Sequence, residues 1–180
     1  MTKLHVLIAG AVCLPAAMAV AQSDYHQQYN NPEEIFHEHE TSLDAFGSIS
    51  IGQQTINHIS GEHVRDDGRL GAGIGLNYFL TRNIGVGGDA YTENTAHSFV
   101  DDASGSLIFR LPLDKIHTAP YVFGGGGYQF DPNEVWFGHV GVGVEVRLTH
   151  NLSLFADARY VMPEKIDNYG VGRAGVRISL

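Results

Sequence analysis

The chain has 180 residues, with 11 basic and 20 acidic side chains and a formal net charge of -9. The length suits one domain, and the acidic balance argues against a nucleic-acid-binding protein. A hydrophobic fraction of 43% excludes a disordered chain. Beyond the first twenty residues, no apolar run reaches the roughly 18 residues that a transmembrane helix needs. These features suit a glycine-rich, exported all-β domain.

Residues 1–21 have the pattern of a secretory signal peptide. Lys3 supplies the positive charge, residues 6–14 are apolar, and Pro15 precedes two small-residue cleavage sites between residues 17 and 21. A buried N-terminal helix and lipid attachment at Cys13 are the alternatives. Cleavage would remove the only cysteine of the chain, so the mature protein would contain no disulfide.

Residues 22–40 are polar and are predicted to form a periplasmic N-terminal segment. Asn31 and Pro32 suit the start of a helix. His37, Glu38 and His39 offer metal-ligating side chains, but residues two apart do not share a helix face. We therefore predict a solvated tail and no metal site.

Residues 41–180 show apolar residues in alternation with polar residues or glycine, which is typical of β-strands. Residues 139–148 show it best: Val140, Val142, Val144 and Val146 share one face, whereas a helix would scatter them. The register of the fifth stretch is undecided because Gly124–Gly127 interrupt it, and a bulge or kink is expected there. Eight strands are predicted, at residues 43–51, 71–80, 84–91, 104–111, 119–130, 139–148, 152–160 and 170–180.

The polar rows hold glycine mixed with charges of both signs, whereas the apolar rows are mostly aliphatic and small. In a soluble barrel the aliphatic rows would face inward, but in a membrane barrel they face lipid and the charges fill the lumen. Strands of about ten residues, tilted, fit the membrane case. The glycines would make room for neighbouring arginines. The predicted lumen charges, paired as a structural plug, are Asp44, Asp89, Arg110, Glu145, Arg147, Asp157, Arg159, Arg173 and Arg177.

The signal peptide, the eight alternating segments and the terminal strand resemble the small outer-membrane β-barrel family, which includes the OmpA barrel domain and OmpX. The resemblance implies a closed antiparallel eight-stranded up-and-down transmembrane β-barrel over residues 41–180, located in the cell outer membrane. It also implies contact with outer-membrane lipid and with the barrel-assembly machinery during insertion. Candidates for the aromatic girdle are Tyr78, Phe109, Tyr121, Phe123, Trp136 and Tyr160.

Three functions remain open on these grounds. A structural, envelope-integrity or surface-interaction role is predicted, in which longer loops such as 53–69 meet surface ligands; no catalytic residue, cofactor or nucleic-acid partner is expected. A soluble lipocalin-like barrel that binds a small apolar ligand is one alternative. A lipid A-modifying enzyme is the other, with Ser98, Glu134 and His139 near the outer end, although His139 falls on the lumenal side of its strand.

Overall fold

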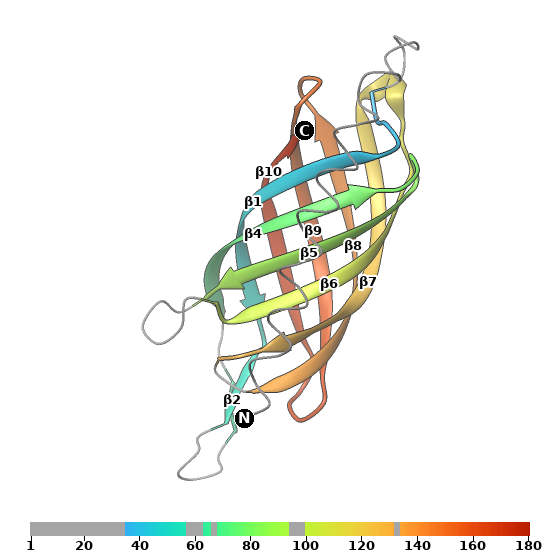
Figure 1. Cartoon of the computed structure of the whole chain (residues 1–180). Helices are drawn as coiled ribbons and strands as arrows, with labels where there is room; N and C mark the ends of the chain where they lie inside the picture. The colour runs from blue at the N-terminus through green and yellow to red at the C-terminus, as the bar shows by residue number, and fades with distance from the viewer. Residues whose placement is uncertain (1–34, 57–62, 66–67, 94–99, 132–133) are drawn as a thin grey trace.

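The chain folds into one closed antiparallel barrel (Figure 1). A computed structural model describes residues 35–56, 63–65, 68–93, 100–131 and 134–180. The predicted signal peptide and residues 22–34, with the expected helix start, lie outside these ranges. The eight barrel strands are β1 (Glu40–Ile51), β4 (Arg69–Phe79), β5 (Ile84–Thr92), β6 (Asp102–Arg110), β7 (Thr118–Gln129), β8 (Val135–Arg147), β9 (Leu152–Pro163) and β10 (Tyr169–Ser179).

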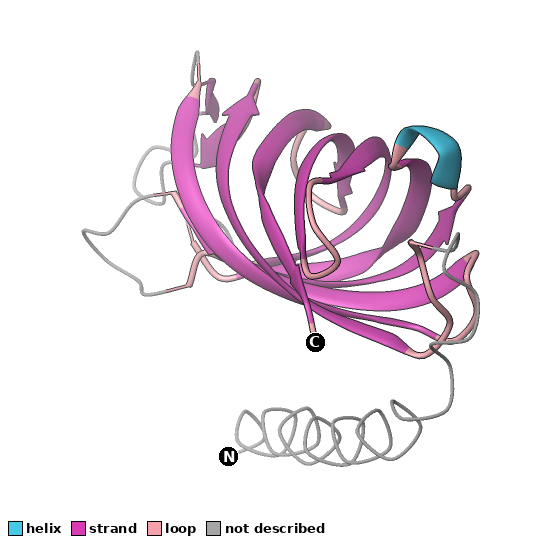
Figure 2. Ribbon diagram, turned by 90° about the horizontal axis from the view of Figure 1, so that it is seen from above, coloured by secondary structure: helices cyan, strands magenta, loops and turns pink. Residues whose placement is uncertain are grey.

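Each strand pairs with the next barrel strand along the chain, and β10 returns to pair with β1. The closing register runs from Ser42 opposite Ser179 to Ile51 opposite Gly170. Figure 2 shows the strands curving round to form the wall. Closure leaves no unpaired strand edge in the barrel, and the predicted eight-stranded up-and-down barrel is confirmed.

The three short turns lie at one end of the barrel, and the two long connections, 52–68 and 93–101, lie at the other end together with two short ones, 130–134 and 164–168. The short turns, at 80–83, 111–117 and 148–151, lie at one end, and the middle one contains the 3-10 helix η1 (Asp114–Ile116). The connection between β1 and β4, at the other end, contains a hairpin that was not predicted, formed by β2 (Gln54–Ile56) and β3 (His63–Arg65). Strands of three residues are too short to show alternation in a sequence.

The aliphatic rows face outward along the wall. Val140 and Val142 of β8 expose 53% and 59% of their surface, and Ile74 of β4 exposes 69%, whereas Glu145 of β8 exposes none. A soluble lipocalin-like barrel would require the reverse arrangement. The structure therefore does not favour that alternative.

Among the described residues, no helix has the length and apolar character to cross a bilayer.

Aromatic side chains fill part of the lumen, which corrects two of the predicted girdle positions. Tyr121 and Phe123 are 7% and 6% exposed and pack with Phe79 and Ile108 inside the barrel. The prediction was wrong because the register of this strand cannot be read next to four glycines. The other four girdle candidates face outward: Tyr78 is half-buried, and Phe109, Trp136 and Tyr160 are exposed.

Inward-facing glycines make room for these rings rather than for arginines. A Cβ on Gly141 would lie 2.4 Å from Phe123, and one on Gly143 would lie 2.5 Å from Tyr121. Gly141 and Gly143 are the register partners of these two aromatic residues on β8. The rings lie over the opposed glycines. The prediction that these glycines make room for arginines is therefore wrong, since aromatic rings occupy the space.

Gly124–Gly127 pair one-to-one with β6 on one side and with β8 on the other, so no residue is inserted. The expected bulge is therefore absent at these positions. Gly127 is needed for close packing, because a Cβ there would lie 2.4 Å from the Ala103 carbonyl oxygen and 2.5 Å from the Phe137 ring.

The close approach of β10 to β1 makes Gly175 sensitive to substitution. A Cβ at Gly175 would lie 2.2 Å from the Ala45 carbonyl oxygen, a backbone atom that cannot rotate away. We expect Gly175→Ala to lower the free energy of unfolding by about 1–3 kcal/mol, measured by urea titration of the refolded barrel in detergent micelles. Gly170→Ala is the control, since nothing lies within 4 Å of its added Cβ. Equal midpoints for the two variants would contradict the expectation.

Candidate functional site

The nine predicted lumen charges all lie inside the barrel, and each takes part in an ion pair. None exposes more than 11% of its side chain. They come from six strands: Asp44 on β1, Asp89 on β5, Arg110 on β6, Glu145 and Arg147 on β8, Asp157 and Arg159 on β9, and Arg173 and Arg177 on β10. Alternation along each strand and closure of the wall bring together residues that are distant in sequence.

Five of these residues, together with Glu40, form a continuous chain of pairs toward the short-turn end. Along the chain, the nitrogen–oxygen distances are 3.1, 2.6, 3.0, 2.7 and 2.8 Å. Three carboxylates alternate with three guanidinium groups, so the formal charges cancel. This six-residue cluster comprises, in order, Arg110, Glu40, Arg147, Glu145, Arg177 and Asp44.

Four further charged residues form a second balanced group, the four-residue cluster of Asp89, Asp157, Arg159 and Arg173. Arg159 and Arg173 both contact Asp89, at 2.7 and 3.0 Å, and Arg173 also contacts Asp157 at 2.8 Å. The Tyr121 hydroxyl donates a hydrogen bond to Asp157 at 2.9 Å. Buried charges are tolerated when they are paired and hydrogen-bonded in this way.

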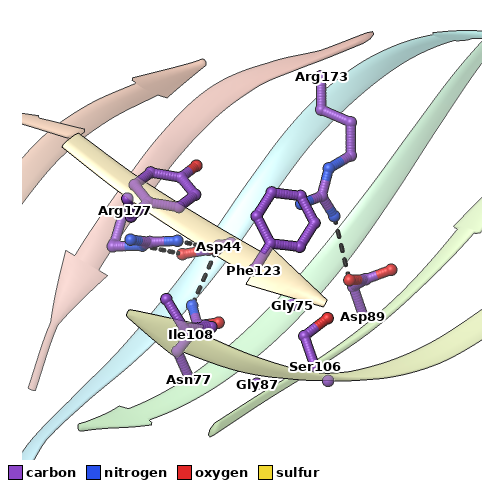
Figure 3. A pocket seen from close by; sticks show the side chains of 12 residues that line it. Asp44, Gly75, Asn77, Gly87, Asp89, Ser106, Ile108, Phe123, Arg173 and Arg177 are labelled. Carbon is purple, nitrogen blue, oxygen red and sulfur yellow. Dashed lines mark hydrogen bonds and ion pairs between the residues drawn. The ribbon is translucent and has the colours of Figure 1, made fainter. Parts of the chain in front are cut away.

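A small cavity lies between the two clusters (Figure 3). The Arg177–Asp44 pair lies on one side of Phe123 and the Arg173–Asp89 pair on the other. The cavity measures about 20 Å³, which is room for about one water molecule. A drug-sized ligand needs a pocket of several hundred Å³, so this cavity does not form a ligand pocket of that kind.

Glu40 is a central lumen residue that sequence reasoning missed. It was assigned to the solvated tail, but it is the first residue of β1 and is 6% exposed. Its carboxylate accepts hydrogen bonds from Arg110, Arg147 and the Ser179 hydroxyl. The alternation along the strand could have indicated this, because Glu40 has the same parity as the lumen-facing Asp44.

Residues 35–39 form a strap across the short-turn end of the lumen. Phe36 is fully buried, and the guanidinium carbons of Arg147 and Arg110 lie 4.6 and 5.1 Å from its ring centre. These arginines and Arg82 also donate hydrogen bonds to the strap carbonyls of residues 35, 37 and 36, respectively. The predicted solvated tail therefore does not extend to these residues.

Asp114 of η1 anchors the beginning of the strap. Its carboxylate accepts a hydrogen bond from the Ile35 N–H at 3.0 Å and contacts Arg82 at 2.5 Å. Partial burial opposes ionisation, but these hydrogen bonds and the Arg82 charge outweigh it and hold the pKa of Asp114 below its ordinary value. The folded state therefore favours the charged form, so this contribution to stability is present at neutral pH and is lost as the pH falls through the lowered pKa.

The residues considered for catalysis do not come together as a site among the described residues. His139 is 1% exposed inside the lumen, and its Nε2 lies 2.9 Å from the Ser106 hydroxyl. Glu134 is exposed and directly precedes β8, and Ser98 lies outside the described ranges. His37 and His39 join no cluster of three or more potential metal ligands within the part of the chain that the structure describes.

Comparison with solved structures shows the fold in other proteins. The N-terminal β-barrel domain of OprF from Pseudomonas aeruginosa aligns with a TM-score of 0.60 and 15% identity, over 80% of this chain and 99% of that domain. OprG from the same organism aligns with a TM-score of 0.58 and 11% identity, over 80% of this chain and 97% of the OprG chain. The attachment invasion locus protein Ail of Yersinia pestis aligns with a TM-score of 0.53 and 16% identity, over 79% of this chain and 99% of the Ail chain. No protein-family model and no curated protein matches the sequence.

The chain thus has the fold of the small outer-membrane β-barrels, as the resemblance in the sequence implied. At these identities the comparisons show the architecture.

Proposed function

We propose that this chain is an integral outer-membrane barrel whose lumen is plugged by paired charges, with a non-enzymatic structural or surface-interaction role. One observation carries the proposal: aliphatic side chains cover the outside of the wall, while guanidinium and carboxylate groups are enclosed. Lipid offers the backbone no hydrogen-bond partners, and a closed barrel satisfies its strand groups internally. The hydrocarbon of outer-membrane lipid is the environment that suits such an aliphatic outer wall.

The two ion-pair clusters support a closed lumen rather than a pore. An eight-stranded barrel is only wide enough for side chains to fill its interior, and here charged, aromatic and strap side chains occupy it. The plug joins strands that are distant in sequence. Arg177 contacts Asp44 across the closing β10–β1 seam and Glu145 on β8. The clusters thus stabilise closure of the barrel.

The short turns are assigned to the periplasmic side and the longer connections to the outside, following the usual asymmetry of these barrels. The hairpin of β2 and β3 then projects outside, where it can meet surface ligands. The barrel-assembly machinery is the partner proposed for insertion.

Fractionation tests the proposal directly. The expressed chain should stay in the outer-membrane fraction after a carbonate wash, require detergent for extraction, and migrate faster on gels when unheated. In planar bilayers the refolded protein should show no stable ion conductance. A protein recovered in the periplasm with unchanged mobility would contradict membrane insertion, and steady channels would contradict the plug.

A further inference from the structure

Buried polar side chains without partners gather at the end of the lumen opposite the short turns. Asp102 is fully buried, and neither of its carboxylate oxygens accepts a hydrogen bond of standard geometry from a described residue, although the Tyr91 hydroxyl is near enough to interact with it outside those limits. Gln129 lies directly opposite Asp102 in the β6–β7 register, is 1% exposed, and likewise has no partner for either amide atom. Buried polar atoms are normally paired, so unpaired carboxylate and amide oxygens this close together require an explanation.

Two further carboxylates lie near Asp102. Asp101 uses one oxygen to accept hydrogen bonds from the Glu93 N–H at 2.6 Å and the Thr92 hydroxyl at 3.3 Å. Glu93 in turn is hydrogen-bonded to the Ser50 hydroxyl. Both carboxylates are close enough to act electrostatically on Asp102. This end of the lumen therefore differs from the two balanced clusters, since Asp102 has two neighbouring carboxyl groups and no ion pair to a described residue.

Nearby arginines do not pair with Asp102. Arg159 acts on Asp102 electrostatically, but its terminal nitrogens bind Asp89 and Ser104. Arg69 lies opposite Ser50 in the β1–β4 register and has contacts of its own. Each buried carboxylate of the two clusters is neutralised by an ion pair. Asp102 forms no such pair with any described residue.

We propose that this end of the lumen binds a divalent cation, Ca²⁺, through oxygens of Asp102, Asp101 and Gln129, with water completing the coordination. All of these ligands are hard oxygens of the kind that Ca²⁺ takes in mixed carboxylate and amide sets. Mg²⁺ fits less well, because it demands near-ideal octahedral geometry and loses its water reluctantly.

The described residues contain no group of three or more histidine, cysteine or acidic side chains already arranged for a metal, so the protein supplies a partial ligand set. Sites of this kind are weak, with dissociation constants of about 10⁻⁴–10⁻³ M in extracellular modules. The bound ion would offset the repulsion among the three carboxylates and would tie β6 to β7 at the rim. That this rim faces the outside of the cell rests on the proposed function; the binding itself does not.

Terbium luminescence provides a direct assay, because Tb³⁺ replaces Ca²⁺ and is sensitised by nearby tyrosines. Tyr91 lies opposite Asp102 in the β5–β6 register, and Tyr169 also lies close enough to interact with Asp102 electrostatically. Tb³⁺ added to the refolded full mature chain in detergent should give tyrosine-sensitised emission that Ca²⁺ displaces at millimolar concentration and Mg²⁺ displaces poorly. Ca²⁺ should also raise the temperature at which unheated gel mobility is lost.

Asp102→Asn should abolish the emission and the thermal shift. Gln129→Met is a second variant, to be used if Asp102→Asn fails to fold, and it should weaken both. Asp131→Asn is the matched control, an acidic residue in the adjoining connection that should leave both unchanged. Three results would overturn the proposal: no Ca²⁺ effect on the unsubstituted chain, an equal effect in Asp102→Asn, or an equal loss in Asp131→Asn. The assay in detergent does not depend on where the chain resides, so its failure is distinct from failure of the proposed function.

Discussion

Glu145→Gln is expected to lower the free energy of unfolding of the barrel by about 3–5 kcal/mol, the range found when one partner of a buried ion pair is removed. The Glu145 carboxylate is fully buried and accepts hydrogen bonds from Arg177 at 2.7 Å, the Ser153 hydroxyl at 2.8 Å and Arg147 at 3.0 Å. Without its charge, the six-residue cluster keeps three guanidinium groups against two carboxylates. The excess positive charge cannot reach water, so the folded state carries the whole cost.

Urea-induced unfolding in detergent or lipid measures this loss. Trp136 is the only tryptophan of the chain and is 59% exposed on the outer wall, so its emission reports insertion of the barrel without labelling. Glu164→Gln is the control, because Glu164 is an exposed acidic residue in the β9–β10 connection. The same small shift in both variants would mean that the buried pairs do not stabilise closure.

The strands could be predicted because each has one wall-facing and one lumen-facing row. That constraint produces period-two alternation within a single segment, which the sequence records locally. The boundaries were less accurate where both rows are apolar. β8 begins at Val135, four residues before the predicted start, because Val135, Trp136 and Phe137 alternate in direction but not in polarity.

The interior arrangement depends on contacts that no single segment records. Arg177 and Asp44 are 133 positions apart and meet only because β10 closes against β1. The sequence placed both residues in the lumen but could not pair them. The same holds for Tyr121 and Phe123, whose inward direction is fixed by the opposed glycines of β8 rather than by the pattern of their own strand.

Phe36 was overlooked for a similar reason. It is one of three aromatic residues in the polar segment 22–40, and the partners that bury it come from β6 and β8. Local composition predicted a solvated tail because it contains no information about the arginines above the strap. Among the described residues, His39 marks the turn from strap to strand, with a left-handed φ of 56°.

Phe36→Ala is expected to release the strap while leaving the barrel closed. Truncating a buried phenylalanine costs about 3–5 kcal/mol when the structure around it must stay in place. The strap can instead peel away, so the loss in global stability is limited to the free energy of strap docking. Amide exchange at Ile35 and His37 should accelerate by at least about tenfold, equivalent to about 1.4 kcal/mol, while the unheated gel mobility stays that of a folded barrel.

Glu38→Ala provides the matched control, because Glu38 is an exposed strap residue two positions after Phe36. Its amide exchange should resemble that of the unsubstituted chain, since its side chain is exposed and the ring stacked on the arginines is that of Phe36. The ring and the backbone hydrogen bonds act together: Arg110 and Arg147 each stack on Phe36 and donate to a strap carbonyl. Unchanged exchange in Phe36→Ala would show that those hydrogen bonds alone hold the strap, and the stacked ring would then have no role in sealing this end.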